Sequence, residues 1–125
     1  MPSDDGPTLA LILFRLQGQT LAVEASRVLA LLPSSSLNAS TQDLARLLGL
    51  PPATITIVPG KRRILRLSDP HAVTGTLDYD VEEPVERRSF PPARIRPRPP
   101  LLPCSPLVRA FALGGDEIIP ILALP

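Results

Sequence analysis

Short apolar segments alternate with prolines and glycines along most of the chain. The 17 prolines and 7 glycines among 125 residues cut the sequence into pieces of roughly five to ten residues, the length of a strand rather than of a helix. Proline interrupts both helices and central strands, so each piece is expected to end near one of these residues. The pattern therefore predicts many short strands joined by tight turns.

Three of these turns are flanked by apolar segments of strand length, which is the pattern of a β-hairpin. The predicted hairpins are residues 8–17 with 20–23 around Gly18 and Gln19, residues 53–58 with 61–67 around Pro59 and Gly60, and residues 107–113 with 117–124 around Gly114, Gly115 and Asp116. The Pro-Gly pair favours a type II turn, because proline presets the first central dihedral angle and glycine accepts the positive second one. Hairpins are therefore expected at both ends of the chain and near its middle.

Three other segments show a different pattern. Residues 72–81 alternate between apolar and polar side chains, the period of a strand with one buried face. Residues 41–48 are predicted to form a short helix, because leucines recur at helical spacing after a polar capping sequence and Gly49 and Pro51 follow. The apolar residues of segment 24–32 fit a helical turn and a bent strand equally well, so the pattern leaves that segment undecided.

The apolar faces of the predicted strands supply a candidate core. We expect the following side chains to be buried: Leu11, Leu13, Val28, Ile57, Leu65, Val73, Leu77, Phe111, Ile119 and Leu122. Several short strands with turn residues at this spacing are typical of all-β proteins. The predicted fold class is all-β, with one or two small β-barrels and one short helix.

Length and composition favour a single folded domain. A chain of 125 residues has room for one core, and with 44% hydrophobic and 20% charged residues it is too apolar to stay disordered. The longest uncharged apolar run, residues 9–14, is much shorter than a membrane span of roughly 20 residues, and Asp4 and Asp5 stand where a secretory signal would be basic. We expect a disordered tail at residues 1–7, a domain over residues 8–125, no membrane insertion and a cytoplasmic location.

The reactive side chains do not form a catalytic or metal-binding pattern. With one cysteine and one histidine, the sequence has no His/Cys cluster for a metal and no disulfide partner for Cys104. His71 follows Asp-Pro in a predicted turn, and no nucleophile elbow surrounds a serine. The sequence therefore predicts a protein that is not an enzyme and needs no cofactor.

Two groups of basic residues are candidates for recognition. The first group lies at the Pro-Gly turn and consists of Lys61, Arg62, Arg63 and Arg66. The second group lies between residues 87 and 98 and consists of Arg87, Arg88, Arg94, Arg96 and Arg98. All charges in residues 78–86 are acidic, so this block can neutralise the basic block that follows it. Nucleic-acid binding is one alternative function. The net charge of +1 and the presence of Phe90 as the sole aromatic residue in these stretches argue against it.

Residues 90–106 form a proline-rich segment that suits a polyproline II conformation better than a central strand. Arg94, Pro97, Pro100 and Pro103 recur every three residues and so lie on one ridge of such a helix. A Src-homology-3 groove reads this spacing in its ligands, which leaves a docking ligand for another protein as a second alternative. The main prediction is a rigid connector packed against the barrel.

Both ends of the chain resemble the CheW-like domain family. The opening LILFRLQGQTLAVEASRV, residues 11–28, is similar to the apolar strand, glycine turn and A-V-x-x-x-x-V return strand of that family. The ending, Pro99 and Pro100 followed by LVRAFALGGDEIIPIL at residues 107–122, is similar to its closing hairpin, and residues 55–81 resemble strands of its second half. The resemblance covers nearly the whole chain and implies a CheW-like fold, which is all-β and built from small SH3-like β-barrels.

The resemblance also implies a function. CheW-like proteins are non-enzymatic adaptors without a cofactor, and the implied partners are the cytoplasmic tip of a chemoreceptor and a CheA-type histidine kinase or another CheW-like protein. The family's G-x-x-x-x-R-G-x-x-x-P-V-x-D-L segment is missing from residues 34–53, so we expect a reduced first subdomain with weakened kinase binding. Ala110 and Ala123 replace the usual glycine and aspartate of the closing hairpin. The candidate partner-binding residues are Leu107, Val108, Phe111, Ile119, Arg62, Arg63, Arg94 and Arg96.

Overall fold

Strands account for most of the structure. The computed structural model describes residues 8–33, 35, 41–49, 62–97 and 107–124. In chain order the strands are β1 (Leu9–Leu16), β2 (Gln19–Glu24), β3 (Val28–Pro33), β4 (Gln42–Asp43), β5 (Arg62–Ser68), β6 (Thr76–Phe90), β7 (Ile95–Pro97), β8 (Val108–Gly114) and β9 (Glu117–Leu122). The helical elements are short and include α1 (Leu44–Leu47) and the 3-10 turns η1 (Ala25–Arg27) and η3 (Pro92–Arg94). The prediction of an all-β fold with one short helix is confirmed.

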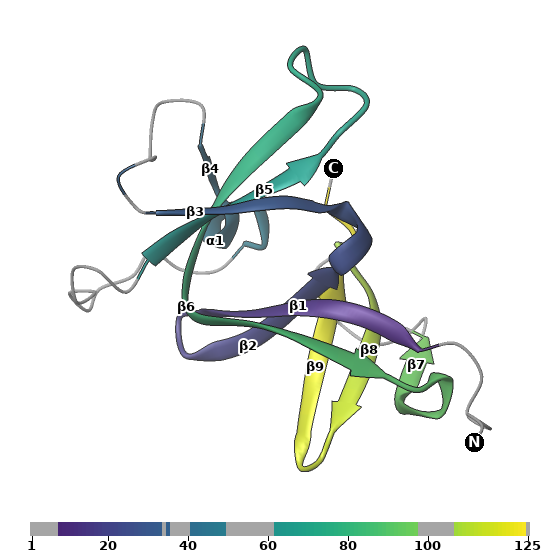
Figure 1. Ribbon diagram of the computed structural model, residues 1–125. Coiled ribbons are helices and arrows are strands. Elements are labelled where there is room, and N and C mark those ends of the chain that lie inside the picture. Colours follow the sequence, from purple (N-terminus) through teal and green to yellow (C-terminus); the bar gives the residue numbers. More distant parts are fainter. Residues whose placement is uncertain (1–7, 34, 36–40, 50–61, 98–106, 125) are drawn as a thin grey trace.

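The described strands form one continuous sheet. Its order is β3-β5-β6-β1-β2-β9-β8-β7, and β4 pairs with β6 outside this path. The long strand β6 pairs with β5 through residues 76–82 and with β1 through residues 82–90, so it runs through both halves of the sheet. Figure 1 shows β3, β4, β5 and α1 around the first part of β6, and β7, β8 and β9 on the other side of the β1–β2 hairpin.

Two hydrophobic cores lie in these halves, and both receive side chains from β1 and β2. We call them the first core and the second core. The first core consists of Phe14, Leu16, Leu21, Val23, Leu44, Leu65, Leu67, Tyr79, Val81, Val108, Leu122 and Leu124. The second core consists of Leu11, Leu13, Ala22, Phe90, Ala110, Ala112, Ile119 and Ile121. Because side chains alternate along a strand, the β1–β2 hairpin supplies one face to each core.

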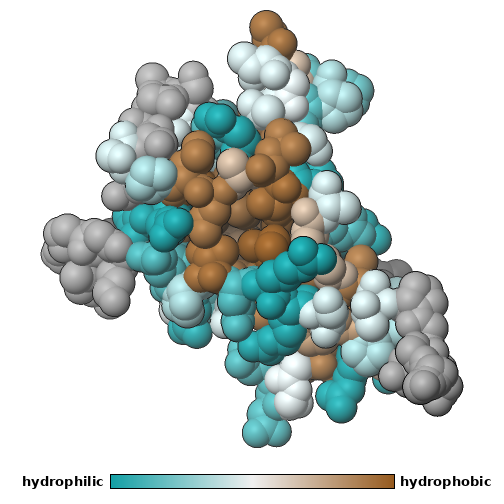
Figure 2. Space-filling view, viewed as in Figure 1, coloured by the Kyte–Doolittle hydropathy of each residue, from teal (hydrophilic) through white to brown (hydrophobic). Residues whose placement is uncertain are grey.

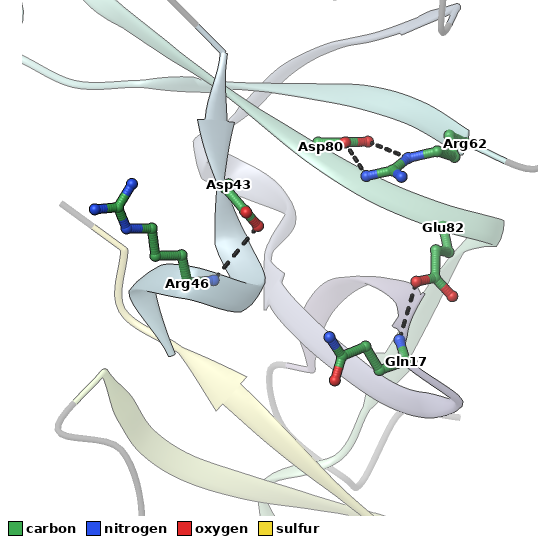
Figure 3. Close-up of polar contacts among 6 residues, drawn as sticks. All are labelled: Gln17, Asp43, Arg46, Arg62, Asp80 and Glu82. Carbon is green, nitrogen blue, oxygen red and sulfur yellow. Dashed lines mark hydrogen bonds and ion pairs between the residues drawn. The ribbon is translucent and has the colours of Figure 1, made fainter. Parts of the chain in front are cut away.

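The first predicted hairpin is confirmed, with its turn one residue earlier than expected. Gln17 and Gly18 form the turn between β1 and β2, with φ angles of 50° and 82°. Two consecutive positive φ angles are typical of the tight turns whose twist matches that of a hairpin. The backbone N–H of Gln17 donates to Glu82 Oε2 of β6 at 3.0 Å, which ties this turn to the neighbouring strand (Figure 3).

The second predicted hairpin is only partly described. Strand β5 begins at Arg62 and has β3 on one side and β6 on the other, so both of its edges are paired. The expected partner, residues 53–58, and the Pro-Gly turn lie outside the described residues. The hairpin that the structure shows for β5 is therefore the one with β6.

The third predicted hairpin is confirmed. The pairing of β8 with β9 begins beside the turn, where Gly114 is opposite Glu117, and ends where Val108 is opposite Leu122. Its register is irregular between Val108 and Ala110. This irregularity explains why Val108 belongs to the first core and Ala110 to the second.

The predicted burial of Val73 is wrong. β6 begins at Thr76, and residues before it form a turn in which the N–H of Asp69 donates to the carbonyl of Gly75 at 2.8 Å. Val73 is at the tip of this turn and is fully exposed. Leu11, Leu13, Leu65, Ile119 and Leu122 are buried as predicted. Of the remaining predicted core residues, Val28, Leu77 and Phe111 are partly buried against the first core, and Ile57 lies outside the described residues.

The helix is shorter than predicted and has a different cap. Residues 42 and 43 form β4, and α1 begins at Leu44 with Asp43 as its N-cap. An Asp43 carboxylate oxygen accepts a hydrogen bond from the backbone N–H of Arg46 at 3.4 Å (Figure 3). Leu44 fixes the helix by inserting into the first core, where it is fully buried.

The described part of the proline-rich segment is not a polyproline II helix. Phe90 is buried at the end of β6, η3 follows it, and β7 pairs antiparallel with β8. Pro97 is the last residue of β7, a strand at the edge of the sheet, where a missing N–H donor is tolerated. Residues 98–106, and with them Cys104, lie outside the described part of the chain, as does the predicted tail at residues 1–7.

Candidate functional site

The arginines of β5 form ion pairs with acidic residues of β6. Arg62 makes two hydrogen bonds to the carboxylate of Asp80, one of them from Nε to Oδ1 at 2.9 Å (Figure 3). Arg66 does the same with Asp78, at 2.8 Å from Nε and 3.1 Å from Nη2. Arg63 Nη1 lies 3.4 Å from Glu83 Oε2. The sheet register creates these pairs, because it places Arg66 opposite Asp78 and Arg62 near Asp80.

This pairing changes the interpretation of the charge blocks. The acidic block, residues 78–86, was expected to neutralise the basic block that follows it in sequence. Most of its ion pairs are instead with arginines of β5. Among the described residues, the one ion pair between the two blocks is that of Arg88 with Glu86, at 2.8 Å. The carboxylate of Asp78 raises the pKa of Arg66 by accepting its hydrogen bonds and by its charge. The candidate residues Arg62 and Arg63 are thus already paired within the protein, which lowers their attraction for a nucleic-acid phosphate.

The candidate residues of the closing hairpin are mostly inside the protein. Val108 is 6% exposed in the first core and Ile119 is fully buried in the second, so neither side chain offers a surface to a partner. Leu107 and Phe111 pack against the first core and are partly buried. Of the four candidate residues on this hairpin, only Leu107 and Phe111 keep exposed side-chain surface.

Arg94 and Arg96 are exposed on η3 and β7. Arg96 Nη1 donates to the backbone carbonyl of Ala93 at 2.7 Å. In the part of the chain that the structure describes, no acidic side chain pairs with either arginine. Of the four candidate arginines, these two are therefore the ones whose charge is available to a partner, and they lie on the β7 side of the sheet, apart from Arg62 and Arg63.

An exposed apolar surface, which the sequence did not reveal, lies on β3. Leu29 is 55% exposed and Leu31 is 36% exposed, and we call these two leucines the β3 patch. Figure 2 shows an apolar area over β3 and between β3 and β1. Leu31 is opposite the buried Leu65 of β5, so the patch continues outward from the first core. The available signal was the absence of charge from Val28 to Pro33, but the segment's ambiguous periodicity hid which leucines face solvent.

β3 is also an end strand of the sheet. Among the described strands, only β5 pairs with it, and its register shifts between Val28 and Ala30. The opposite end of the sheet is β7, which is three residues long and carries Arg96 and Pro97. Short length, charge and proline are features that keep an edge strand from associating with other chains. β3 has leucines instead of charges, so it is the edge better suited to contact another protein.

Among the described residues, charged side chains gather at one hollow but form no metal site. No three His, Cys, Asp or Glu side chains among them are placed to hold a metal ion. A hollow of about 120 Å³ between β1, β2, β6 and β9 is lined by charged residues, but its Arg88 pairs with Glu86 and its Arg15 bonds to Thr20 and the carbonyl of Gly18. The helices of the described chain are all too short to cross a membrane.

Comparison with known proteins identifies the fold. No protein-family model matches the sequence, and no curated protein matches it. The structure is similar to the crystal structure of the scaffolding protein TtCheW from Thermoanaerobacter tengcongensis, with a TM-score of 0.74 over 94% of this chain and 90% of that chain. The fold is CheW-like. The two sequences are 15% identical, so the similarity concerns the fold.

Proposed function

We propose that this protein is a non-catalytic adaptor in a chemotaxis-like bacterial signalling pathway, and that its partner is the cytoplasmic tip of a chemoreceptor. The observation that carries the proposal is the β3 patch on a CheW-like fold. Leu29 and Leu31 leave apolar surface in water, and apolar patches of this kind mark sites of protein contact. The resemblance to a scaffolding protein supports binding rather than catalysis as the role.

A second part of the proposal concerns the histidine kinase. The sequence lacks the family segment with the Arg-Gly and Pro-Val residues, and the family resemblance places the kinase contact on the subdomain that contains it. We therefore propose that kinase binding is weak while receptor binding persists. Leu107 and Phe111 remain proposed contacts because both keep some exposed surface. Arg94 and Arg96 remain proposed contacts because both are exposed and pair with no acidic side chain among the described residues.

Two titrations test the proposal. The protein is titrated by calorimetry with a soluble receptor fragment that contains the cytoplasmic tip, and separately with the isolated regulatory domain of a CheA-type kinase from the same organism. We expect measurable binding to the receptor fragment and weaker or no binding to the kinase domain. Tight kinase binding without receptor binding would overturn the proposal. Binding to neither would favour the docking-ligand alternative, which a peptide spanning residues 90–103 then tests directly.

A further inference from the structure

One arginine connects three segments that are far apart in the sequence. Arg27 lies in η1, the turn between β2 and β3. Its Nη2 donates to the backbone carbonyl of Ser68 at 2.8 Å, and its Nη1 donates to the backbone carbonyl of Leu124. Ser68 is the last residue of β5, and Leu124 follows the last strand, β9. A single half-buried side chain thus joins the first half of the sheet to the end of the described chain.

Both carbonyls that accept from Arg27 are held in place by neighbouring contacts. Next to Ser68, the N–H of Asp69 donates to the carbonyl of Gly75 at 2.8 Å and closes the β5–β6 turn. Next to Leu124, the N–H of Ala123 donates to the carbonyl of Leu107 at 2.7 Å. The Leu124 side chain is 3% exposed in the first core. Arg27 therefore bridges two anchored segments rather than two loose ends.

The chemistry of the contact favours arginine. A guanidinium is planar and presents five donors, so two of its nitrogens can reach two acceptors at once, whereas a lysine ammonium has one nitrogen. Hydrogen bonds from a charged donor are stronger than those between neutral groups, and more so when they are partly shielded from water. Tyr79 is buried in the same region, and the charges of both Arg27 and Asp69 act on its phenol.

We propose that Arg27 couples the segment at residues 123–124 to the β5–β6 turn, so that the two segments are released together when η1 moves. The location of η1 connects this coupling to the β3 patch. Val28 follows Arg27 directly and begins β3, and the exposed Leu29 comes next. A protein that binds the β3 patch and shifts β3 also shifts Arg27, and the change then reaches residues 123–124, which follow β9. This inference goes beyond the proposed function and does not depend on the identity of the partner.

Amide hydrogen exchange on the free protein tests this coupling. The N–H groups of Asp69 and Ala123 report on the two sides of Arg27, because each is hydrogen bonded beside a carbonyl that Arg27 holds. In Arg27→Met, which keeps an apolar stem but has no donor, we expect exchange at both positions to rise by about tenfold or more. The amides of Ala112 and Ile119, which pair between β8 and β9, should be unchanged. A rise at only one reporter, or an equal rise at all four amides, would overturn the proposal.

A matched control variant removes a different arginine near η1. Arg109 Nη1 lies 3.1 Å from Glu24 Oε1, and the Arg109 side chain is 51% exposed. Arg109→Met removes a cation but leaves both bonds of Arg27 intact, so exchange at Asp69 and Ala123 should stay within about twofold of the wild type. If this variant raises exchange at both amides as much as Arg27→Met does, the effect comes from lost charge and not from the bridge.

A second design reads the coupling without relying on Arg27→Met alone. Leu124→Ala loosens the last segment from the first core, and with Arg27 present we expect faster exchange at Ala123 and also at Asp69. In Arg27→Leu, which has no donor for either carbonyl, Leu124→Ala should raise exchange at Ala123 but no longer at Asp69. If Asp69 responds equally in both backgrounds, or in neither, the proposal is wrong.

Discussion

Leu13 and Phe14 are consecutive residues of β1, yet their side chains lie in different hydrophobic cores. Leu13 is in the second core and is 2% exposed, while Phe14 is in the first core and has no exposed surface. The cross-strand partners follow the same division, since Leu13 is opposite Ala22 and Phe14 is opposite Leu21. In this part of the hairpin neither face is left to solvent, so β1 and β2 form the wall that the two cores share.

The two cores predict that alanine substitution of two phenylalanines lowers the free energy of unfolding by very different amounts. Phe14→Ala removes a fully buried ring from the first core and should lower the free energy of unfolding by about 3–5 kcal/mol. Phe111→Ala removes a ring that is only partly buried, and its cost should be smaller. Urea unfolding of the two variants measures both values. Equal losses, or a larger loss at Phe111, would contradict the burial that the structure assigns.

The β3 patch predicts a loss of binding without a loss of stability. Leu29→Ser and Leu31→Ser together should weaken binding to the receptor fragment by about tenfold or more, because binding would remove the apolar surface of both leucines from water and serine has little apolar surface to bury. Ile118→Ser is the matched control, since Ile118 is 67% exposed on β9 and lies outside the patch. Calorimetric titration measures binding, and thermal unfolding confirms that the variants remain folded. Equal weakening by the control would show that the patch is not the contact.

The ion pairs between β5 and β6 predict that acidic residues suppress nucleic-acid binding. Asp78→Asn with Asp80→Asn would leave Arg62 and Arg66 without their carboxylate partners. We expect the wild type to bind DNA weakly at best and the double variant to bind it more tightly, with an affinity that falls steeply as salt increases. Fluorescence anisotropy with a labelled duplex at two salt concentrations measures this. Tight, salt-sensitive binding by the wild type would instead support the nucleic-acid alternative.

The single tyrosine predicts a loss of stability at high pH. Burial raises the pKa of Tyr79 above its usual value of 10.0, Arg27 lowers it and Asp69 raises it again, with a net upward shift. The unfolded chain releases this proton at about pH 10 while the folded chain still holds it. Stability from this group is therefore complete below pH 10 and is lost as the pH rises through the folded pKa.

Tyr79 can be followed alone because it is the only tyrosine of the chain. Absorbance at the phenolate band should show a higher midpoint in the folded protein than in the protein unfolded by urea. Tyr79→Phe should reduce the fall in unfolding free energy above pH 10. Equal midpoints in the folded and unfolded protein would show that the phenol is not buried as the structure places it.

Local patterns along the chain were enough to predict the fold class, two hairpins and a short helix, and five of the ten residues predicted for the core are buried. Hairpin turns and short strands depend on residues close together in the sequence, such as Gln17 and Gly18, whose backbone angles the turn requires. The family resemblance added the CheW-like fold. Val73 was misplaced because the alternating pattern extends through the turn before β6, and periodicity alone does not show where a strand begins.

The tertiary structure decided which residues are available for function. The sequence suggested Val108 and Ile119 as contact residues, but both are buried, Val108 in the first core and Ile119 in the second. Leu29 and Leu31 are exposed instead, on β3 at the end of the sheet. The pairing of Arg62 with Asp80 and the bridge from Arg27 to Ser68 and Leu124 also join residues distant in the sequence. Such contacts depend on which strands become neighbours, so the sequence determined the elements of this protein and the packing of those elements determined its surfaces.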